Sequence, residues 1–155
     1  MKTVLITGSN RGLGLEFAKC YSENNYNVIA CCRNKDVASD LHSLSKKHDS
    51  IQIYSLDVSD TDQIKTLSNS LQSQPIDIII NNAGIYRPST VGDIDKDDWM
   101  DSFLVNTIAP YEIIQNFLPH LLSGESKKIV SITSKMGSID DNTSGGSYIY
   151  RSSKT

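Results

Sequence analysis

Short apolar runs recur along the chain at a nearly regular interval, and each is rich in valine and isoleucine. The runs are TVLIT (3–7), NVIACC (27–32), IQIYSL (51–56), IDIIINN (76–82) and KIVSIT (128–133). Because they are nearly continuous rather than alternating, they are typical of strands buried on both faces of a sheet. We therefore predict five β-strands at these positions.

The segments between the runs carry apolar residues at helical spacing, which predicts helices over 12–24, 36–47, 60–72 and 95–121. Strand and helix alternate four times, and this favours parallel strands joined by right-handed helical crossovers. The predicted fold is α/β, a doubly wound parallel sheet with strand order 3-2-1-4-5 and helices on both faces. Nothing in the pattern divides the chain, so we expect a single domain over residues 1–155.

Composition narrows the class of protein. A formal net charge of -3 gives no electrostatic reason to expect a nucleic-acid partner or an anionic membrane surface. No apolar run approaches the ~18 residues of a membrane span, and the polar start is unlike a signal peptide. The chain has three cysteines, Cys20, Cys31 and Cys32. Because their number is odd and two are adjacent, they indicate packing residues rather than disulfides or a metal site. We expect a cytoplasmic protein that binds no metal.

A glycine-rich turn, VLITGSNRGLGLEFAK, follows the first predicted strand and opens the first helix. In such a turn Gly8 allows tight bending, Gly12 lets backbone approach a phosphate, and Gly14 lets helix pack closely on strand. The helix N-terminus then offers free N–H groups to an anion. The alternative is a turn that needs glycine for its geometry alone. We favour a dinucleotide site whose candidate residues here are Gly8, Ser9, Asn10, Arg11, Gly12, Leu13 and Gly14.

The end of the second predicted strand bears on which nicotinamide cofactor would bind. An acidic residue near this point commonly binds the ribose 2′-hydroxyl of NAD. Here Arg33 stands in the neighbourhood, and Arg11 lies in the glycine-rich turn. Two guanidinium groups suit a 2′-phosphate, so NADP(H) is favoured over NAD(H). Asp36 lies close enough in sequence to keep NAD(H) open, and two solvated surface arginines are the other alternative.

Polar residues also close the third and fourth predicted strands. Asp57 and Val58 follow the third, where Asp57 could cap the next helix. The amide of Asn82 ends an otherwise apolar run, and the small Ala83 and Gly84 beyond it leave room for a ligand. Within the long predicted helix 95–121 stands Asn106, a residue type that helices disfavour.

Tyr150 and Lys154 are four residues apart, so on a helix they share one face. A phenol is a poor proton donor at neutral pH, and a nearby ammonium group favours its ionised form. A tyrosine tuned in this way can deliver a proton to a carbonyl oxygen while a hydride reaches the carbon. Ser134 lies just past the fifth strand, where a hydroxyl can bind a substrate carbonyl; neighbouring hydroxyl candidates are Ser131, Thr133 and Ser138.

These motifs, in this order, resemble the short-chain dehydrogenase/reductase family along the whole chain. TGSNRGLGLEF and MGSIDDNTSGGSYIYRSSK are similar to the C-factor/sniffer branch of carbonyl reductases. The resemblance implies a Rossmann fold and an NADP(H)-dependent oxidoreductase acting on a small carbonyl or alcohol, and it is compatible with a homo-oligomer. It assigns catalysis to Asn106, which holds a water of the proton relay, and to Ser134, Tyr150 and Lys154. It also places Asp57, Val58, Asn82, Ala83, Gly84, Tyr150 and Lys154 against the cofactor.

Members of this family continue well past the position of Thr155, so the resemblance implies a fold that is incomplete at its C-terminus. The helix that carries Tyr150 holds about two turns here, and helices this short depend on tertiary packing. We expect the 155-residue chain by itself to be a poor enzyme. The alternative function is a catalytically inactive nucleotide-binding or C-factor-like signalling protein.

Overall fold

The computed structural model describes residues 1–72 and 74–155. Five parallel strands form one sheet in the order β3-β2-β1-β4-β5, which confirms the predicted order. The strands are β1 (Thr3–Thr7), β2 (Asn27–Cys32), β3 (Ile51–Ser55), β4 (Ile78–Asn81) and β5 (Lys128–Ser131). The helices are α1 (Gly12–Glu23), α2 (Ser39–Ser45), α3 (Thr61–Ser70), α4 (Lys96–Phe103), α5 (Ala109–Ser123) and α6 (Tyr148–Lys154).

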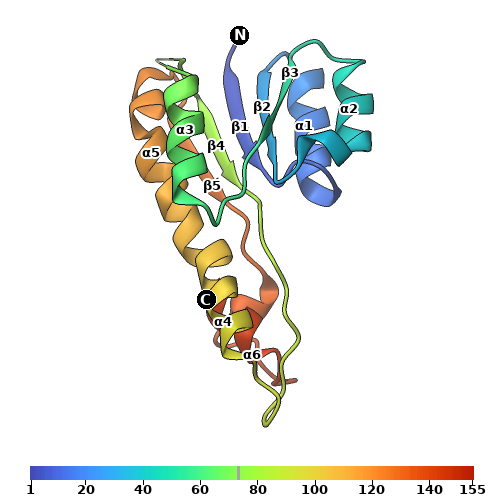
Figure 1. Cartoon of the computed structure of the whole chain (residues 1–155), viewed down its shortest axis with the longest axis vertical. Coiled ribbons are helices and arrows are strands. Elements are labelled where there is room, and N and C mark those ends of the chain that lie inside the picture. The colour runs from blue at the N-terminus through green and yellow to red at the C-terminus, as the bar shows by residue number, and fades with distance from the viewer. Residues whose placement is uncertain (73) are drawn as a thin grey trace.

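Helices cover both faces of the sheet, as a doubly wound fold requires (Figure 1). Alternate residues of β1 point to opposite faces: Leu5 joins the core beneath α3 and α5, while Val4 and Ile6 join the core beneath α1 and α2. Phe117 of α5 and Leu41 of α2 are fully buried, one in each core. Because all neighbouring strands are parallel, their carboxyl ends meet at one edge of the sheet.

The prediction that every strand is buried on both faces holds for the three central strands and is wrong for the two edge strands. All residues of β1 and β4 are buried, whereas β3 is only partly buried and every residue of β5 is exposed. An edge strand has one hydrogen-bonded neighbour, and Ile129 and Val130 of β5 remain 44% and 38% exposed. Apolar composition alone does not distinguish these positions.

The helix predicted over 95–121 is interrupted. A π-helical turn over Leu104–Ile108 separates α4 from α5 and carries Asn106. Pro110 explains part of this defect, because it has no N–H to donate to the carbonyl of Asn106 four residues earlier. The segment predicted as a helix over 36–47 likewise divides, into a 3-10 turn over Lys35–Val37 and α2. π-helical turns like the one over Leu104–Ile108 are frequent at functional sites.

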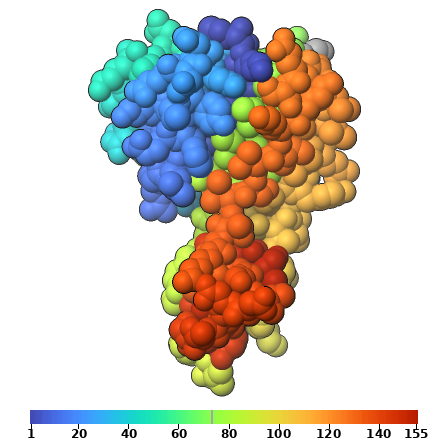
Figure 2. Space-filling model, turned by 180° about the vertical axis from the view of Figure 1, so that it is seen from behind, coloured from blue at the N-terminus to red at the C-terminus, as the bar shows by residue number. Residues whose placement is uncertain are grey.

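The chain has two regions of different construction (Figures 1 and 2). The body contains the sheet with α1, α2, α3 and α5. The distal lobe, residues 85–107 and 132–155, contains α4 and α6 and projects beyond the carboxyl ends of the central strands. Among the described residues, no helix combines the length and apolar composition needed to cross a bilayer. Cys31 and Cys32 pack in the body as predicted, whereas Cys20 is exposed.

Candidate active site

A cleft of about 1260 Å³ extends from the carboxyl ends of the central strands into the distal lobe. It is larger than the ~300–1,000 Å³ of an ordinary small-molecule pocket, so it has room for an elongated ligand. Of the residues predicted from sequence, those that line it are Gly8, Asn10, Arg11, Gly12, Leu13, Arg33, Asp57, Val58, Asn82, Ala83, Gly84, Tyr150 and Lys154. The predicted residues outside the lining are Ser9, Gly14, Asn106 and Ser134.

The glycine-rich turn has the geometry that its sequence predicts. Gly8 and Gly12 have φ of +68° and +55°, and a Cβ added at Gly12 would meet nothing within 4 Å. At Gly14 a Cβ would overlap the carbonyl oxygen of Gly8, so close packing of α1 on β1 requires glycine there. Ser9 is buried and its hydroxyl donates to the carbonyl of Ile6, which explains its absence from the lining. The turn is therefore held in place by the Ser9 hydrogen bond and by the close packing at Gly14, and it is open toward the cleft.

The first turn of α1 is open to an anion. Its N-cap residue, Arg11, makes no side-chain capping hydrogen bond, and the turn contains no acidic residue. Free backbone N–H groups at a helix N-terminus favour negative charge. The start of α1 thus suits a phosphate group that approaches over Gly12.

Asn82 ties the end of β4 to the glycine-rich turn. Its Nδ2 donates to the carbonyl oxygens of Thr7 and Gly8 at 2.9 and 3.0 Å. The Thr7 hydroxyl in turn accepts from the backbone N–H groups of Asn82 and Ala83, each at 3.1 Å. These bonds satisfy the side-chain amide nitrogen of Asn82 and hold two walls of the cleft together.

At the end of β2 the cleft is bordered by cations. Arg33 is exposed and lines the cleft together with Arg11, and Asn34 and Val37 complete this edge. Asp36, the acidic residue that kept NAD(H) open, is exposed but is not part of the described lining. The charge at this end of the cleft therefore favours an anionic group.

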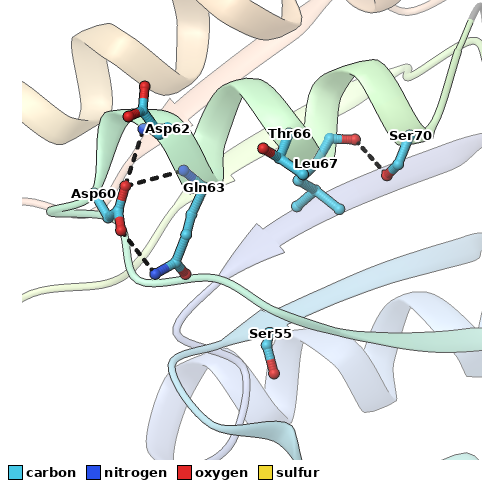
Figure 3. A pocket seen from close by; sticks show the side chains of 7 residues that line it. All are labelled: Ser55, Asp60, Asp62, Gln63, Thr66, Leu67 and Ser70. Carbon is cyan, nitrogen blue, oxygen red and sulfur yellow. Dashed lines mark hydrogen bonds between the residues drawn. The ribbon is translucent and has the colours of Figure 1, made fainter.

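The suggestion that Asp57 caps the helix after β3 is wrong, because Asp60 does so. Asp60 Oδ1 accepts from the backbone N–H groups of Asp62 and Gln63, both at 3.0 Å (Figure 3). Asp57 instead accepts from the backbone N–H and the hydroxyl of Ser59, which orients its carboxylate at the cleft. Its backbone N–H donates to Gln63 Oε1 at 2.9 Å, so the helix cap also positions the cleft wall.

A second, smaller hollow of about 310 Å³ lies beside α3, and several of its polar groups already take part in hydrogen bonds of this helix (Figure 3). Gln63 Nε2 donates to Asp60 Oδ2 at 2.9 Å. Backbone and side-chain hydrogen bonds from Gln63 lower the pKa of Asp60. The hydroxyl of Ser70 donates to the carbonyl of Leu67 within the helix. The polar groups of Asp60, Gln63 and Ser70 in this hollow are therefore already used in hydrogen bonds of α3.

Tyr150 and Lys154 lie on α6 and line the distal end of the cleft, as their spacing predicts. Lys154 is half-buried, its Nζ donates to the carbonyl of Ile132 at 3.0 Å, and burial lowers its pKa. A Cβ added at Gly84 would lie 3.2 Å from Asn106 Oδ1 and 3.4 Å from Lys154 Nζ. The absence of a side chain at Gly84 therefore leaves a small polar space between the amide and the ammonium.

Asn106 is a buried connector. Its Oδ1 accepts from the backbone N–H of Ile85, and its Nδ2 donates to the carbonyl of Ile85 and the hydroxyl of Ser153, each at 2.9 Å. The amide thus joins the strand-4 loop to α6 through the π-helical turn. One lone pair of Oδ1 remains for a further donor in the space beside Gly84.

The sequence profile described as "short chain dehydrogenase" matches residues 2–155. The chain belongs to the short-chain dehydrogenase family. The C-signal protein of Myxococcus xanthus is 35% identical over 92 residues, which are 59% of this chain and 55% of that protein. The NADPH-bound carbonyl reductase from chicken fatty liver superposes with a TM-score of 0.92 at 35% identity, covering 99% of this chain and 69% of that one.

The carbonyl reductase Sniffer of D. melanogaster has a TM-score of 0.88 at 31% identity, over 99% of this chain and 70% of that one. These likenesses confirm the predicted family and the resemblance to its C-factor/sniffer branch. The chain spans little more than half the length of C-signal and of the other curated relatives that it matches first.

Ser134 lies at the start of a 3-10 turn rather than in the described cleft lining. Its Oγ accepts from the backbone N–H of Met136 at 3.1 Å, which leaves the O–H free to donate. Thr133 does line the cleft, but its hydroxyl donates to the carbonyl of Lys154. Ser138 accepts from the backbone N–H of Asp141.

Several cleft residues escaped the sequence analysis because they belong to no motif: Asn34, Val37, Ile85, Tyr86, Arg87, Asp101 and Val105. Most lie in or beside the distal lobe. The available signal was the position of Ile85 and Tyr86 directly after NNAG, since residues beyond the carboxyl end of a parallel strand border the ligand crevice.

Proposed function

We propose that the protein is an NADP(H)-dependent oxidoreductase that interconverts a small carbonyl compound and its alcohol, with Tyr150 as proton donor and acceptor. One observation carries this proposal: Tyr150 and Lys154 line the same cleft whose other end is formed by the open N-terminus of α1 and two arginines. The overall reaction is carbonyl plus NADPH plus a proton to alcohol plus NADP⁺. The bound cofactor supplies or accepts the hydride.

The cofactor fits the residues at the body end of the cleft. Gly12 and the first turn of α1 would hold the pyrophosphate, because the backbone there is open and the N–H groups are free. Arg11 and Arg33 would hold the 2′-phosphate, which is the basis for favouring NADP(H) over NAD(H). Asp57 and Val58 would border the adenine, as the family resemblance suggests. The small-molecule substrate would enter at the distal lobe.

The proton is handled by residues of the lobe. The phenol of Tyr150 gives its proton to the carbonyl oxygen, and the ammonium of Lys154 stabilises the phenolate that remains. A water in the space beside Gly84 could bond to Asn106 Oδ1 and Lys154 Nζ and return the proton. The O–H of Ser134, free to donate, would bind the carbonyl oxygen.

The test of this chemistry is Tyr150→Phe. We expect NADPH oxidation with a panel of aldehydes and ketones to fall by about 10²-fold or more, because only the proton donor is lost. The NADPH dissociation constant should stay within about twofold in fluorescence titration, since phenylalanine keeps the aromatic ring of Tyr150 and loses only the hydroxyl. Turnover that survives the substitution would show that Tyr150 is not the acid.

The cofactor preference has its own test, Arg33→Ala. Losing one charge-assisted contact to a 2′-phosphate should weaken NADPH about tenfold or more and leave NADH within about twofold. Titration calorimetry with both cofactors measures this. Lys35→Ala, which removes a cation two residues away that is not part of the described lining, is the control. Equal weakening of both cofactors by Arg33→Ala would refute the 2′-phosphate contact.

A second function is favoured by the similarity to C-signal: nucleotide binding without turnover, with a signalling role. It predicts NADPH binding that depends on Gly14 and Arg33, and no steady NADPH oxidation with any carbonyl. The NADPH oxidation assay above therefore separates the candidates, whereas the Arg33→Ala titration should give the same result for both.

A further inference from the structure

Tyr86 is a cleft residue that the family motifs do not explain. It follows the NNAG turn after β4 and lines the distal end of the cleft beside Tyr150. The two rings meet edge to face, with centroids 5.1 Å apart and an interplanar angle of 66°. Even so, 53% of Tyr86 remains exposed. A large aromatic surface is therefore held next to the proposed proton donor and left uncovered.

The ring is fixed at both ends. Its hydroxyl lies 3.1 Å from the hydroxyl of Ser147, the left-handed residue that begins α6. The backbone beside it is clamped by the two bonds between Ile85 and Asn106. Downstream, Ser89 accepts from the backbone N–H groups of Ser147 and Ile149. A surface that is already ordered binds its ligand without the cost of ordering it.

The neighbours of Tyr86 favour a neutral ligand. Ile85, Val105 and Ile132 contribute aliphatic surface to this end of the cleft. The one arginine here, Arg87, has its Nε 3.0 Å from Asp98 Oδ1, an ion pair whose angle does not make a hydrogen bond. The carboxylate of Asp101 lines the cleft, whereas Asp98 is not part of the described lining. Asp98 and Asp101 offset the charges of Arg87 and Lys154, so this end of the cleft has no excess charge that would select an ionic substrate.

We propose that Tyr86 is a specificity-determining residue, and that its ring selects carbonyl substrates whose carbonyl carbon is attached to a flat, neutral aromatic group. This rests on the proposed function, since it names the substrate class for that same site. Aromatic rings pack on one another in offset or edge-to-face geometry, and such pairs attract each other beyond the effect of the area that they bury. An aryl group beside Tyr86 would bring its carbonyl next to the phenol of Tyr150.

The test compares benzaldehyde with cyclohexanecarbaldehyde, which have the same ring size and reacting group and differ in flatness. The readout is the ratio of their kcat/KM values at saturating NADPH, because the ratio cancels any general loss of activity. Tyr86→Leu should lower the ratio about 3- to 10-fold, as expected for one lost aromatic contact. Tyr86→Phe should keep the ratio, and Tyr86→Trp should keep or raise it. Tyr111→Leu, an exposed tyrosine on α5, is the matched control.

A binding measurement separates this proposal from the proposed function. Saturation-transfer NMR with benzyl alcohol and cyclohexylmethanol on the NADP⁺-loaded protein requires no turnover. Preference for benzyl alcohol that disappears in Tyr86→Leu supports the aromatic site even if the protein reduces neither aldehyde. A ratio that stays within twofold in Tyr86→Leu, by kinetics and by binding, overturns the proposal. So does an equal loss for both compounds, which would make Tyr86 a support for α6 only.

Discussion

The body and the distal lobe are held together by different forces, and the difference matches the division of the cleft. The body buries large aliphatic and aromatic side chains in two cores, among them Phe117, Ile64 and Leu41. In the lobe the buried residues are Ser89, Ser102, Asn106, Ile149 and Ser153, of which only one is apolar. The proposed cofactor end of the cleft thus rests on hydrophobic burial, and the proposed catalytic end rests mainly on hydrogen bonds.

Hydrogen bonds from upstream segments hold the short helix α6. Trp99 Nε1 donates to the Ser152 hydroxyl at 2.8 Å, and the Thr107 hydroxyl donates to the carbonyl of Ser153 at 2.8 Å. Arg151 donates to the carbonyls of Gly146 and Met136 and to the hydroxyl of Ser144. Each such bond contributes only about 0.5–1.5 kcal/mol net, because the unfolded chain bonds to water instead. We therefore expect the lobe to open more readily than the body.

The largest expected effects on stability come from truncating one buried side chain in each region. Phe117→Ala should lower the free energy of unfolding by about 3–5 kcal/mol, because it removes the largest fully buried side chain of the body. Ile149→Ala should act on the lobe alone. Amide hydrogen exchange measures both: the first variant should accelerate exchange throughout, and the second should accelerate it in α4 and α6 while β1 and β2 stay protected.

The exposed Leu122→Ala on α5 serves as the control, since its side chain is 61% exposed. If Ile149→Ala instead raised exchange in β1 as much as in α6, the two regions would form one cooperative unit and the comparison would fail.

A smaller effect is expected from two glycines that mark close contacts, one in each region. A Cβ at Gly14 would overlap Gly8 in the cofactor turn, and a Cβ at Gly137 would overlap the carbonyl of Lys154. Overpacking of this kind costs about 1–3 kcal/mol. Gly14→Ala should therefore weaken NADPH about tenfold or more in titration, whereas Gly137→Ala should leave NADPH affinity within about twofold and reduce turnover.

Gly145→Ala is the matched control, because it adds a methyl group at φ +61° with nothing within 4 Å. This variant should lower the free energy of unfolding only by the cost of placing alanine in a left-handed conformation, about 1–2 kcal/mol. Loss of NADPH binding in Gly137→Ala would mean that the two ends of the cleft are not independent.

These two regions also differ in how far the sequence alone predicts them. The runs of valine and isoleucine indicate the five strands and their order, because burial of both sheet faces produces a pattern in the sequence. The spacing of Tyr150 and Lys154 places both on α6 for the same kind of reason, a helical period. The glycine-rich turn is predictable because Gly8, Gly12 and Gly14 each meet a backbone requirement that other residues meet poorly.

The lobe is less predictable because its contacts join segments far apart in the chain and leave no period. Nothing near Trp99 in sequence indicates a bond to Ser152, and nothing near Asn106 indicates that its amide clamps Ile85. The π-helical turn and the ring contact of Tyr86 escaped for this reason. So did the exposure of β5, since its apolar residues look the same as those of β4 until the sheet order is known.

The smallest effect concerns the loss of one carboxylate interaction in acid, that of Asp77 in the body. Asp77, at the start of β4, accepts backbone N–H groups of Thr3, Glu125 and Ser126 at 2.8–3.0 Å. Burial by itself would raise the pKa of Asp77, but these bonds and the charge of Lys2 outweigh it and lower the pKa. Because the folded-state value lies below the unfolded one, near 4, the carboxylate stabilises the body above that pH. The contribution disappears as pH falls through the folded-state value.

Asp77→Asn should therefore reduce stability by about 1–2 kcal/mol at pH 7 and much less at pH 2.5, so its curve of stability against pH should be flatter than that of the unmodified protein. Denaturant unfolding from pH 7 to 2.5 measures this, and the exposed Asp140→Asn, in the lobe, is the control. In amide exchange, acid should weaken protection in β1 and β4 through Asp77, while the contacts around Asn106 and Ser153, which carry no titrating group, should keep their pH-corrected protection. Parallel stability curves for Asp77→Asn and the unmodified protein would show that this carboxylate does not account for acid sensitivity of the body.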